Sequence, residues 1–492
     1  FNGFAFNSTT FTNILSVPSP AVKTNYMSIK VTFNPCTSEW TLTARDDGAA
    51  FADPSTVSGT GAAAVNSTFT AVNLLWLGQV WNHGSGGCTL AKIDNIYIPK
   101  VGTSTGTYTW NGSTGTDFQS PYNWTPVRQC ATAADKLVFN SSSPASSVLT
   151  NVPVQTVAQL TITNNRTLTL HDVAGDGLVS TLTIAGSTGT DFQVDAGSAV
   201  ILDVTSAAAG DAMQISLGAG ATASISGTIS FKSTPGGTRP HRLLANDANA
   251  VTVNAGGIIK AIDLTGNPFG SSMPQHTIVF NSGSVYECYS GANPFGLAQP
   301  ASKVLFNTGS TYRHFSANPP SVLGRTYADV ESNTSYDITT GGAAVFTVNS
   351  FKILGGTVQF TGAINSQPVN TDIKGDLVLM PGTGFLYEPV AASTFQFNGA
   401  TVAQKITSAG TLSLGRNLTV KLNNSYATPP QLTVETSISV SGVLDITQGT
   451  LKLTGNITLV SDSFATASVA PITGLINYGT GRFIVERYIP AH

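Results

Sequence analysis

The residues best suited to chemistry lie together in the segment TRPHRLLAND. Arg239, His241 and Arg242 follow a Pro-Gly turn, and Asp247 comes five residues after Arg242. A polysaccharide lyase needs a basic residue beside carboxylates, and a glycoside hydrolase needs two carboxylates at a fixed separation. Three other acidic residues of this region are isolated in the sequence, with no Asp-Asp pair among them: Asp191, Asp195 and Asp203. The simpler interpretation is therefore a solvated corner of the chain, and an active site is the alternative.

A second acidic group lies near the start of the chain. The single Asp-Asp pair, Asp46-Asp47, is followed by Asp53 and by Asp94-Asn95. Hard cations prefer several carboxylate and carbonyl oxygens, so Asp46, Asp47 and Asp53 are candidate calcium ligands. The competing interpretation is a polar hairpin, because Asp-Asp-Gly is a turn signal. Apart from this calcium site, we expect no cofactor.

Two further features of the first hundred residues bear on binding and on stability. Trp81 and His83, in GQVWNHGSGG, are candidates for carbohydrate binding, with core packing as the alternative for the tryptophan. The four cysteines form no CxxC pair and have no histidine at metal-ligand spacing, so zinc is not expected. A disulfide between Cys36 and Cys88 would indicate an oxidising compartment, and free thiols are the open alternative.

The elements that must position these residues repeat along the chain. NPFGSSMPQHTIVFNSGSVYE, from Asn267, returns 26 residues later as NPFGLAQPASKVLFNTGSTYR, with ten of 21 positions identical. A period of this length is typical of a solenoid, in which each unit buries its apolar face against its neighbours. Equivalent residues of adjacent coils would then stack in ladders. The expected ladder pairs are Phe269 on Phe295, Asn281 beside Asn307, and Tyr286 beside Tyr312.

Short segments that alternate apolar and polar residues run from end to end, separated by glycine-containing corners, and helical periodicity is nearly absent. The sequence therefore predicts an all-β protein. Irregular spacing between the segments favours a parallel β-helix over a propeller. At 26 residues a coil, this helix would have roughly 12 coils and a length of about 60 Å.

The local composition and residue pattern along the chain predict four parts. Residues 1–100 would be part of a β-sandwich, 101–132 a linker and cap containing Trp110 and Trp124, 133–462 the parallel β-helix, and 463–492 the start of a following β module. Charged residues make up 10% of the chain, and the net charge is -3 with no Lys/Arg run, which argues against nucleic acid as a partner. No apolar run approaches the length of a membrane span.

Several segments resemble a known class of proteins. GTYTWNGSTGTDFQSPYNWTP, ILGGTVQF, GTLKLTGNITLVSDSFATASVAPITG and GRFIVERYIPA resemble giant cell-surface proteins of Bacteroidota that are exported by the type IX secretion system. IKVTFNPCTSEWTLTARDDG, AFADP and KIDNIYI resemble the closing half of a laminin-G or concanavalin-like jelly roll. The resemblance implies an extracellular or outer-surface location, the secretion translocon as a transient partner, and a chain that is part of a longer protein.

These observations lead to three functional hypotheses. The first is a non-catalytic, adhesin-like stalk or scaffold that contacts surface polysaccharide or other cells. The second is a carbohydrate-active or carbohydrate-binding β-helix. The third is a subunit of a self-assembling extracellular filament, because open β edges invite pairing.

Overall fold

The computed structural model describes residues 106–489, except 187, 271–273 and 292, together with six strands between Asn2 and Val65. The chain divides into two units, of which the first contains Phe1–Ser104 and Val127–Ala131 and the second the remainder. The protein is almost entirely β: the described helical structure is one short 3-10 turn, Pro121–Asn123.

The described strands of the first unit are antiparallel. β1 (Asn2–Asn7) pairs with β2 (Thr10–Ser16), and β3 (Tyr26–Asn34) pairs with β4 (Glu39–Gly48). Two short strands, β5 (Gly59–Thr60) and β6 (Ala64–Val65), also pair with β4. This antiparallel pairing is compatible with a β-sandwich.

The second unit is a parallel β-helix built on one sheet that runs through its whole length. This long sheet has 14 parallel strands, one from each turn of the helix. In order they are β10 (Ser146–Leu149), β13 (Thr167–His171), β16 (Ala199–Asp203), β19 (Thr228–Phe231), β22 (Ile258–Ala261), β24 (Val285–Cys288), β26 (Thr311–His314), β27 (Asp329–Ser332), β30 (Phe351–Ile353), β33 (Leu377–Leu379), β36 (Gln404–Ser408), β39 (Leu432–Val434), β42 (Thr450–Leu453) and β45 (Leu475–Tyr478). The helix therefore has about 14 turns, somewhat more than the roughly 12 expected.

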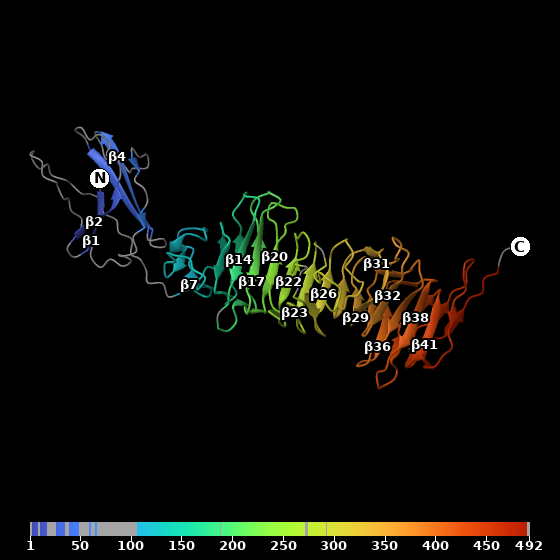
Figure 1. The fold of residues 1–492 in the computed structure, drawn as a ribbon. Coiled ribbons are helices and arrows are strands. Elements are labelled where there is room, and N and C mark those ends of the chain that lie inside the picture. Colours follow the sequence, from blue (N-terminus) through green and yellow to red (C-terminus); the bar gives the residue numbers. More distant parts are fainter. Residues whose placement is uncertain are drawn as a thin grey trace, which may run out of the picture. The chain divides into compact units, whose positions relative to one another are not determined.

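Two further sheets complete the N-terminal half of the helix. A nine-stranded sheet contains β25 (Val304–Phe306), β23 (Ile278–Phe280), β21 (Val251–Val253), β18 (Ala223–Ile225), β15 (Phe192–Val194), β12 (Gln159–Ile162), β9 (Lys136–Phe139), β7 (Thr107–Trp110) and β8 (Trp124–Thr125). A four-stranded sheet contains β11 (Gln155–Val157), β14 (Val179–Ile184), β17 (Ala212–Leu217) and β20 (Arg242–Ala245). Figure 1 shows these turns following one another in sequence order.

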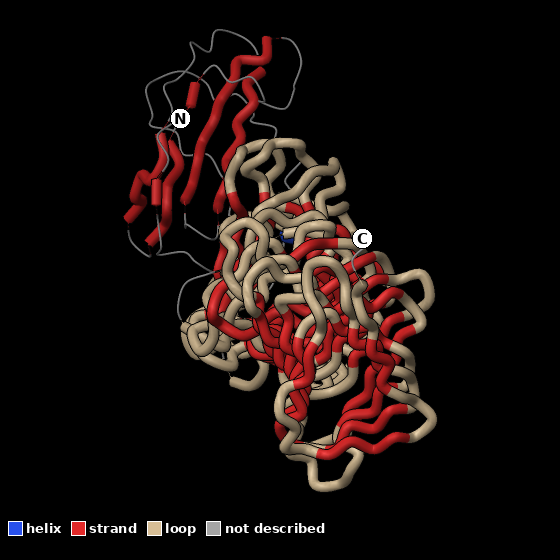
Figure 2. Tube along the Cα trace, turned by 90° about the vertical axis from the view of Figure 1, so that its right-hand side faces the viewer, coloured by secondary structure: helices blue, strands red, loops and turns tan. Residues whose placement is uncertain are grey.

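The C-terminal half uses a different pair of sheets beside the long sheet. The seven-stranded sheet contains β28 (Tyr336–Ile338), β31 (Thr357–Phe360), β34 (Gly384–Tyr387), β37 (Thr411–Leu414), β40 (Ile438–Val440), β43 (Ile457–Leu459) and β46 (Phe483–Val485). The six-stranded sheet contains β29 (Gly342–Val348), β32 (Val369–Ile373), β35 (Ser393–Phe397), β38 (Leu418–Asn423), β41 (Val443–Gln448) and β44 (Ser468–Val469). Figure 2 shows the strands gathered into walls and the loops projecting from the corners.

The helix extends beyond both of its expected limits. β7 pairs in parallel with β9, so the first strand begins within the segment expected to be a linker. At the other end, β45 and β46 pair in parallel with β42 and β43, where the segment 463–492 was expected to start a new module. The pairs Thr450↔Leu475 and Ile457↔Phe483 are 25 and 26 residues apart, which is one coil. The final strands therefore continue the same repeat.

One continuous hydrophobic core fills the helix. At its N-terminal end Trp110 and Trp124 are buried, with their ring centroids 5.0 Å apart and nearly perpendicular. Phe118 and Phe139 contact this pair, so four aromatic rings fill the first turns. Aromatic edges packed on faces contribute beyond the area they bury.

The two NPFG segments lie beyond β20, the last strand of the four-stranded sheet. Phe269 and Phe295 are both buried, and each meets the phenylalanine of its own repeat at a steep angle: Phe269 meets Phe280 at 6.4 Å and Phe295 meets Phe306 at 5.6 Å. Stacking between repeats occurs instead at Phe280 and Phe306, whose centroids are 4.8 Å apart. Both loop phenylalanines thus contact a strand residue of the same repeat, and Phe295 also meets Tyr327, just before β27, at 4.7 Å.

The other two expected ladder pairs lie on adjacent turns. Tyr286 and Tyr312 are opposite each other in β24 and β26, and their rings stack at 5.6 Å with an interplanar angle of 18°. The side-chain amide of Asn307 donates to Asn281 Oδ1 at 3.0 Å. The 26-residue repeat thus corresponds to one turn of the helix.

Candidate functional site

Three loops on consecutive turns carry four buried ionisable side chains, Asp172, Asp211, Arg239 and His241. They connect the long sheet to the four-stranded sheet and span residues 172–178, 204–211 and 232–241. We call them the loop cluster. The strands that follow the loops, β14, β17 and β20, are neighbours in one sheet (Figure 1), so the loops are held one coil apart.

The first two loops are joined through Asp211. The backbone amides of Gly175 and Gly177 each donate to its carboxylate at 2.8 Å. Burial raises the pKa of Asp211, but the hydrogen bonds from these amides and from Ser206 outweigh burial and hold the pKa below its ordinary value. Gly210 lies so close to the first loop that a Cβ atom there would be 2.1 Å from the carbonyl oxygen of Gly177. This close approach requires glycine.

Asp203 ties the second turn to the third. It accepts hydrogen bonds from the Thr234 amide at 2.7 Å and from the Thr234 hydroxyl at 2.5 Å. His171 Nε2 lies 3.5 Å from the same carboxylate. Burial raises the pKa of Asp203, but hydrogen bonds from His171, Thr234 and Val204 outweigh burial and hold the pKa well below its usual range. Asp203 is therefore ionised at neutral pH.

The pKa of Asp172 is shifted in the opposite direction. Its side chain is 1% exposed, and neither carboxylate oxygen has a hydrogen-bond partner. Burial, followed by repulsion from Asp211 and Asp176, raises the pKa of Asp172 to about 7 against an opposing effect of His171. Two carboxyl groups on adjacent turns thus have pKa values shifted in opposite directions, which is the arrangement that acid-base chemistry uses.

The basic segment TRPHR is not the solvated corner that its sequence suggested. His241 is fully buried, and Arg239 is 6% exposed. The Met213 amide donates to His241 Nδ1 at 3.1 Å, and burial lowers the pKa of this histidine. Arg239 donates to the Ser206 and Thr238 carbonyl oxygens. Both side chains are buried because the third loop packs against the second.

The two other residues predicted to belong to this group, Arg242 and Asp247, lie in different places. Arg242 donates to the carbonyl oxygens of His241 and Thr265. Asp247 lies after β20, where it accepts from the Gly220 amide at 2.6 Å. The structure therefore brings Arg239 and His241 toward Asp203 and Asp211, acidic residues more than 25 positions away in sequence, and not toward Asp247. Only knowledge of which strands are neighbours could have found this cluster.

The loop cluster is closed to ligands in this conformation, because the oxygens of Asp172 are inaccessible to solvent. Among the described residues, no group of three or more histidine, cysteine, aspartate or glutamate side chains is placed to hold a metal ion.

Most of the candidate residues of the first unit fall where the structure gives no description. Asp46 and Asp47 lie within β4, where Asp46 is opposite Met27 of β3, so the Asp-Asp-Gly segment belongs to a strand and not to a hairpin turn. Five candidates lie outside the described residues: Asp53, Trp81, His83, Cys36 and Cys88. The calcium, carbohydrate and disulfide sites stay predictions.

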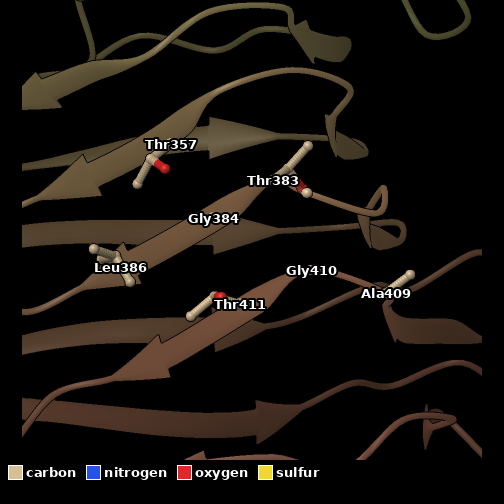
Figure 3. Close-up of a pocket in the computed structure, with 8 residues that line it drawn as sticks. Thr357, Thr383, Gly384, Leu386, Ala409, Gly410 and Thr411 are labelled. Atoms are coloured by element: carbon tan, nitrogen blue, oxygen red, sulfur yellow. The ribbon is translucent and has the colours of Figure 1, made fainter.

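An open hollow of about 560 Å³ lies on the seven-stranded sheet of the C-terminal half (Figure 3). Gly384 stands in register between Thr357 and Thr411 of the two neighbouring strands. All the lining residues are small or uncharged: Thr357, Gly382, Thr383, Gly384, Leu386, Ala409, Gly410 and Thr411.

A ladder of alternating charges crosses five neighbouring strands of the long sheet. Its members are Lys260, Glu287, Arg313, Glu331 and Lys352, each opposite the next in register. Successive nitrogen-oxygen distances are 3.2, 3.3, 2.8 and 3.9 Å. This ladder could not be predicted from the sequence, because its signal, alternating sign at one strand position, becomes visible only when the strands are aligned.

No protein-family model matches the chain, and neither the curated proteins nor the solved structures contain a match to it. Across the described ranges, no helix has the length and apolar character needed to cross a bilayer.

Proposed function

We propose that the chain is a non-catalytic extracellular spacer, a stalk that separates an adhesive part of a surface protein from its attachment. The observation that supports this proposal is the long sheet, which continues through all 14 turns without a break. At about 4.8 Å between strands, 13 intervals span about 60 Å.

The packing supports a mechanical role for this sheet. Each turn pairs with its two neighbours through parallel ladders, and the core is continuous from Tyr108 to Ala467. In such a solenoid, stability is close to a sum over turns and their interfaces, so length can change without a change of design. A spacer needs this property, because its useful quantity is length.

The resemblance noted in the sequence supplies the rest of the proposal. An origin among type IX secretion substrates would place the spacer on the outer surface of a bacterium, with the secretion translocon as its partner during export. Surface polysaccharide or other cells would be the targets of adhesion.

A carbohydrate-binding function is the second candidate, and the hollow around Gly384 favours it. The hydroxyl groups of Thr357 and Thr411 flank an uncharged depression, which suits a neutral glycan better than an anion. Replacing Thr411 with Val keeps the side-chain volume and removes one hydroxyl. If the hollow binds neutral glycans, this change should weaken binding on a glycan array, and Thr458→Val, on another strand of the same sheet, should not.

Removal of whole turns tests the spacer. Leu377 is opposite Ile406, so deleting residues 377–405 joins Asp376 to Ile406 and removes one turn in register. Leu168 is opposite Val200, so deleting residues 168–199 removes one turn that carries part of the loop cluster. Cells displaying either variant should keep adhesion, with a reach shortened by about 5 Å.

The two deletions also separate the spacer from a site-borne function. Equal, small effects of both deletions on adhesion support the spacer. Complete loss of adhesion on one deletion, while the other is tolerated and both variants fold, would place the function in one turn and overturn the proposal. Polysaccharide turnover by the parent chain would overturn its non-catalytic part.

A further inference from the structure

Asp172 is a buried acid of the loop cluster whose carboxyl oxygens have no hydrogen-bond partner. A buried polar group without a hydrogen-bond partner is costly, and a buried charge without one is more so. Asp172 follows directly on β13, and its side chain is 1% exposed with both oxygens unpartnered. The closed loops therefore tolerate the neutral acid better than its carboxylate.

The charged groups around Asp172 increase this preference. Asp176 of the same loop and Asp211 of the next loop repel its ionised form, whereas the neighbouring His171 attracts it. The cation of the third loop, Arg239, donates to two carbonyl oxygens of the loops, those of Ser206 and Thr238. His241 accepts a hydrogen bond at Nδ1 from the backbone amide of Met213, in β17.

The loop that carries Asp172 is held by few contacts. Its link to the second loop is the pair of hydrogen bonds from Gly175 and Gly177 to Asp211, together with the close approach of Gly210. Gly175 and Gly177 have φ angles of +81° and +72°, a region that favours glycine, and Leu178 is 66% exposed. The ladders of the long and four-stranded sheets end at His171 and resume at Val179, so the segment itself takes no part in strand pairing.

We propose that loop 172–178 is a proton-operated latch, closed while Asp172 holds its proton and released when Asp172 gives the proton up. Release would expose Asp172, His171 and Asp203 to solvent and to ligands. A pKa of about 7 in the closed state supports this proposal, because the exposed carboxyl would titrate near its ordinary value of 3.8.

The sign of the effect follows from these two states. The closed loop binds the proton more tightly, so opening becomes more favourable as the pH rises from about 4 to about 7 and levels off above it. The opening equilibrium should change about tenfold per pH unit when one proton is released on opening. The titration of Asp211 and Asp203 affects the opening equilibrium only below this pH range, because the pKa values of both carboxyl groups are lowered in the closed state.

Hydrogen-deuterium exchange of the full chain, corrected for intrinsic exchange rates, tests the latch at the amides of Gly175 and Gly177. Their protection should fall by about a hundredfold from pH 5 to pH 7, while that of β38 stays constant. Asp172→Asn, a neutral isostere, should abolish the fall. Asp195→Asn, on the turn between β15 and β16, and His241→Gln should leave the fall unchanged.

Gly210→Ala provides the reference for the open loop, because its Cβ would collide with the Gly177 carbonyl oxygen. Protection in this variant should be low at every pH. Constant protection in the parent chain, or the same fall in Asp172→Asn, would overturn the proposal. If Asp172→Asn does not fold, Asp176→Asn supplies the second test, because it removes one charge that repels the Asp172 carboxylate. In this variant the protection of the Gly175 and Gly177 amides should stop falling at a lower pH, and its total decrease should be smaller.

Discussion

The two halves of the β-helix share one sheet but fill their turns differently. Between β13 and β20 the inward residues are mainly aliphatic, with Phe192 and Phe231 as isolated aromatic rings, and the ionisable groups are buried in loops at the corner. Between β29 and β35 the interior is a continuous set of contacting aromatic rings: Phe346, Phe351, Phe360, Phe385, Tyr387 and Phe395. Both kinds of interior, aliphatic and aromatic, pack against the same long sheet. The backbone ladder, and not the choice of side chains inside it, therefore defines the coil.

This difference implies different sensitivities. The aromatic turns bury large side chains and depend on packing, whereas the loop cluster depends on hydrogen bonds to charged groups and on pH. Substitutions in the aromatic turns should therefore alter stability through packing, whereas substitutions in the loop cluster should alter how stability depends on pH.

The largest effect is expected in the aromatic half. Phe385→Ala removes a fully buried ring that contacts Phe351, Phe360, Tyr387 and Phe395. We expect a loss of about 3 to 5 kcal/mol of unfolding free energy, since truncation of a core phenylalanine adds a cavity to the lost transfer free energy. Denaturant unfolding followed by circular dichroism measures it. Ile364→Ala, at a side chain 75% exposed, should change stability by less than about 0.5 kcal/mol.

The second effect is a pH dependence, and its sign at His314 is opposite to its sign at Asp172 of the N-terminal half. His314, between them, is 1% exposed, and burial lowers its pKa from 6.5 to about 4. Its neutral form stabilises the fold above pH 6.5, and this contribution, about 3 kcal/mol, is lost as the pH falls to 4. Asp172 acts in reverse, because its raised pKa favours the folded state at low pH.

Replacement of His314 with Gln should remove that acid loss. The slope of unfolding free energy between pH 6.5 and pH 4 is the measurement, and His276→Gln, at a half-buried position, is the control that should keep the slope. An unchanged slope in His314→Gln would show that the acid sensitivity arises elsewhere.

A smaller effect is expected when one hydrogen bond of the loop cluster is removed. Thr234→Val deletes the hydroxyl that donates to Asp203 but keeps the backbone amide donor. Hydrogen bonds to charged groups contribute about 1.5 to 3 kcal/mol, and the remaining partners of Asp203 place the loss near the lower value. Thermal unfolding measures it, with Thr228→Val, on the outer face of β19, as the control. A loss equal to that of the control would mean that the hydroxyl bond contributes nothing.

Much of the fold could be predicted from the sequence, because alternation and glycine corners are local signals. The all-β class, the parallel β-helix and the one-coil period are visible in segments such as those around Asn267 and Asn293. The ends of the helix were misplaced because the first and last strands, β7 and β46, have ordinary strand signals whose partners are one coil away. The buried state of His241 and the unpartnered state of Asp172 could not be predicted, since both depend on which loops lie on neighbouring turns.

The smallest effect should come from the outer charge ladder, which lies on the shared sheet. Arg313→Met keeps the aliphatic stem and removes the charge between Glu287 and Glu331. Because the Arg313 side chain is 36% exposed, we expect a loss of about 1 kcal/mol or less that shrinks as salt is raised to 1 M. Lys405→Met, in the exposed pair with Glu435, should cost less still. A loss as large as that of Phe385→Ala would mean that paired charges on the sheet surface stabilise the stack as strongly as its aromatic core, and the distinction between the two halves would then lie outside the helix interior.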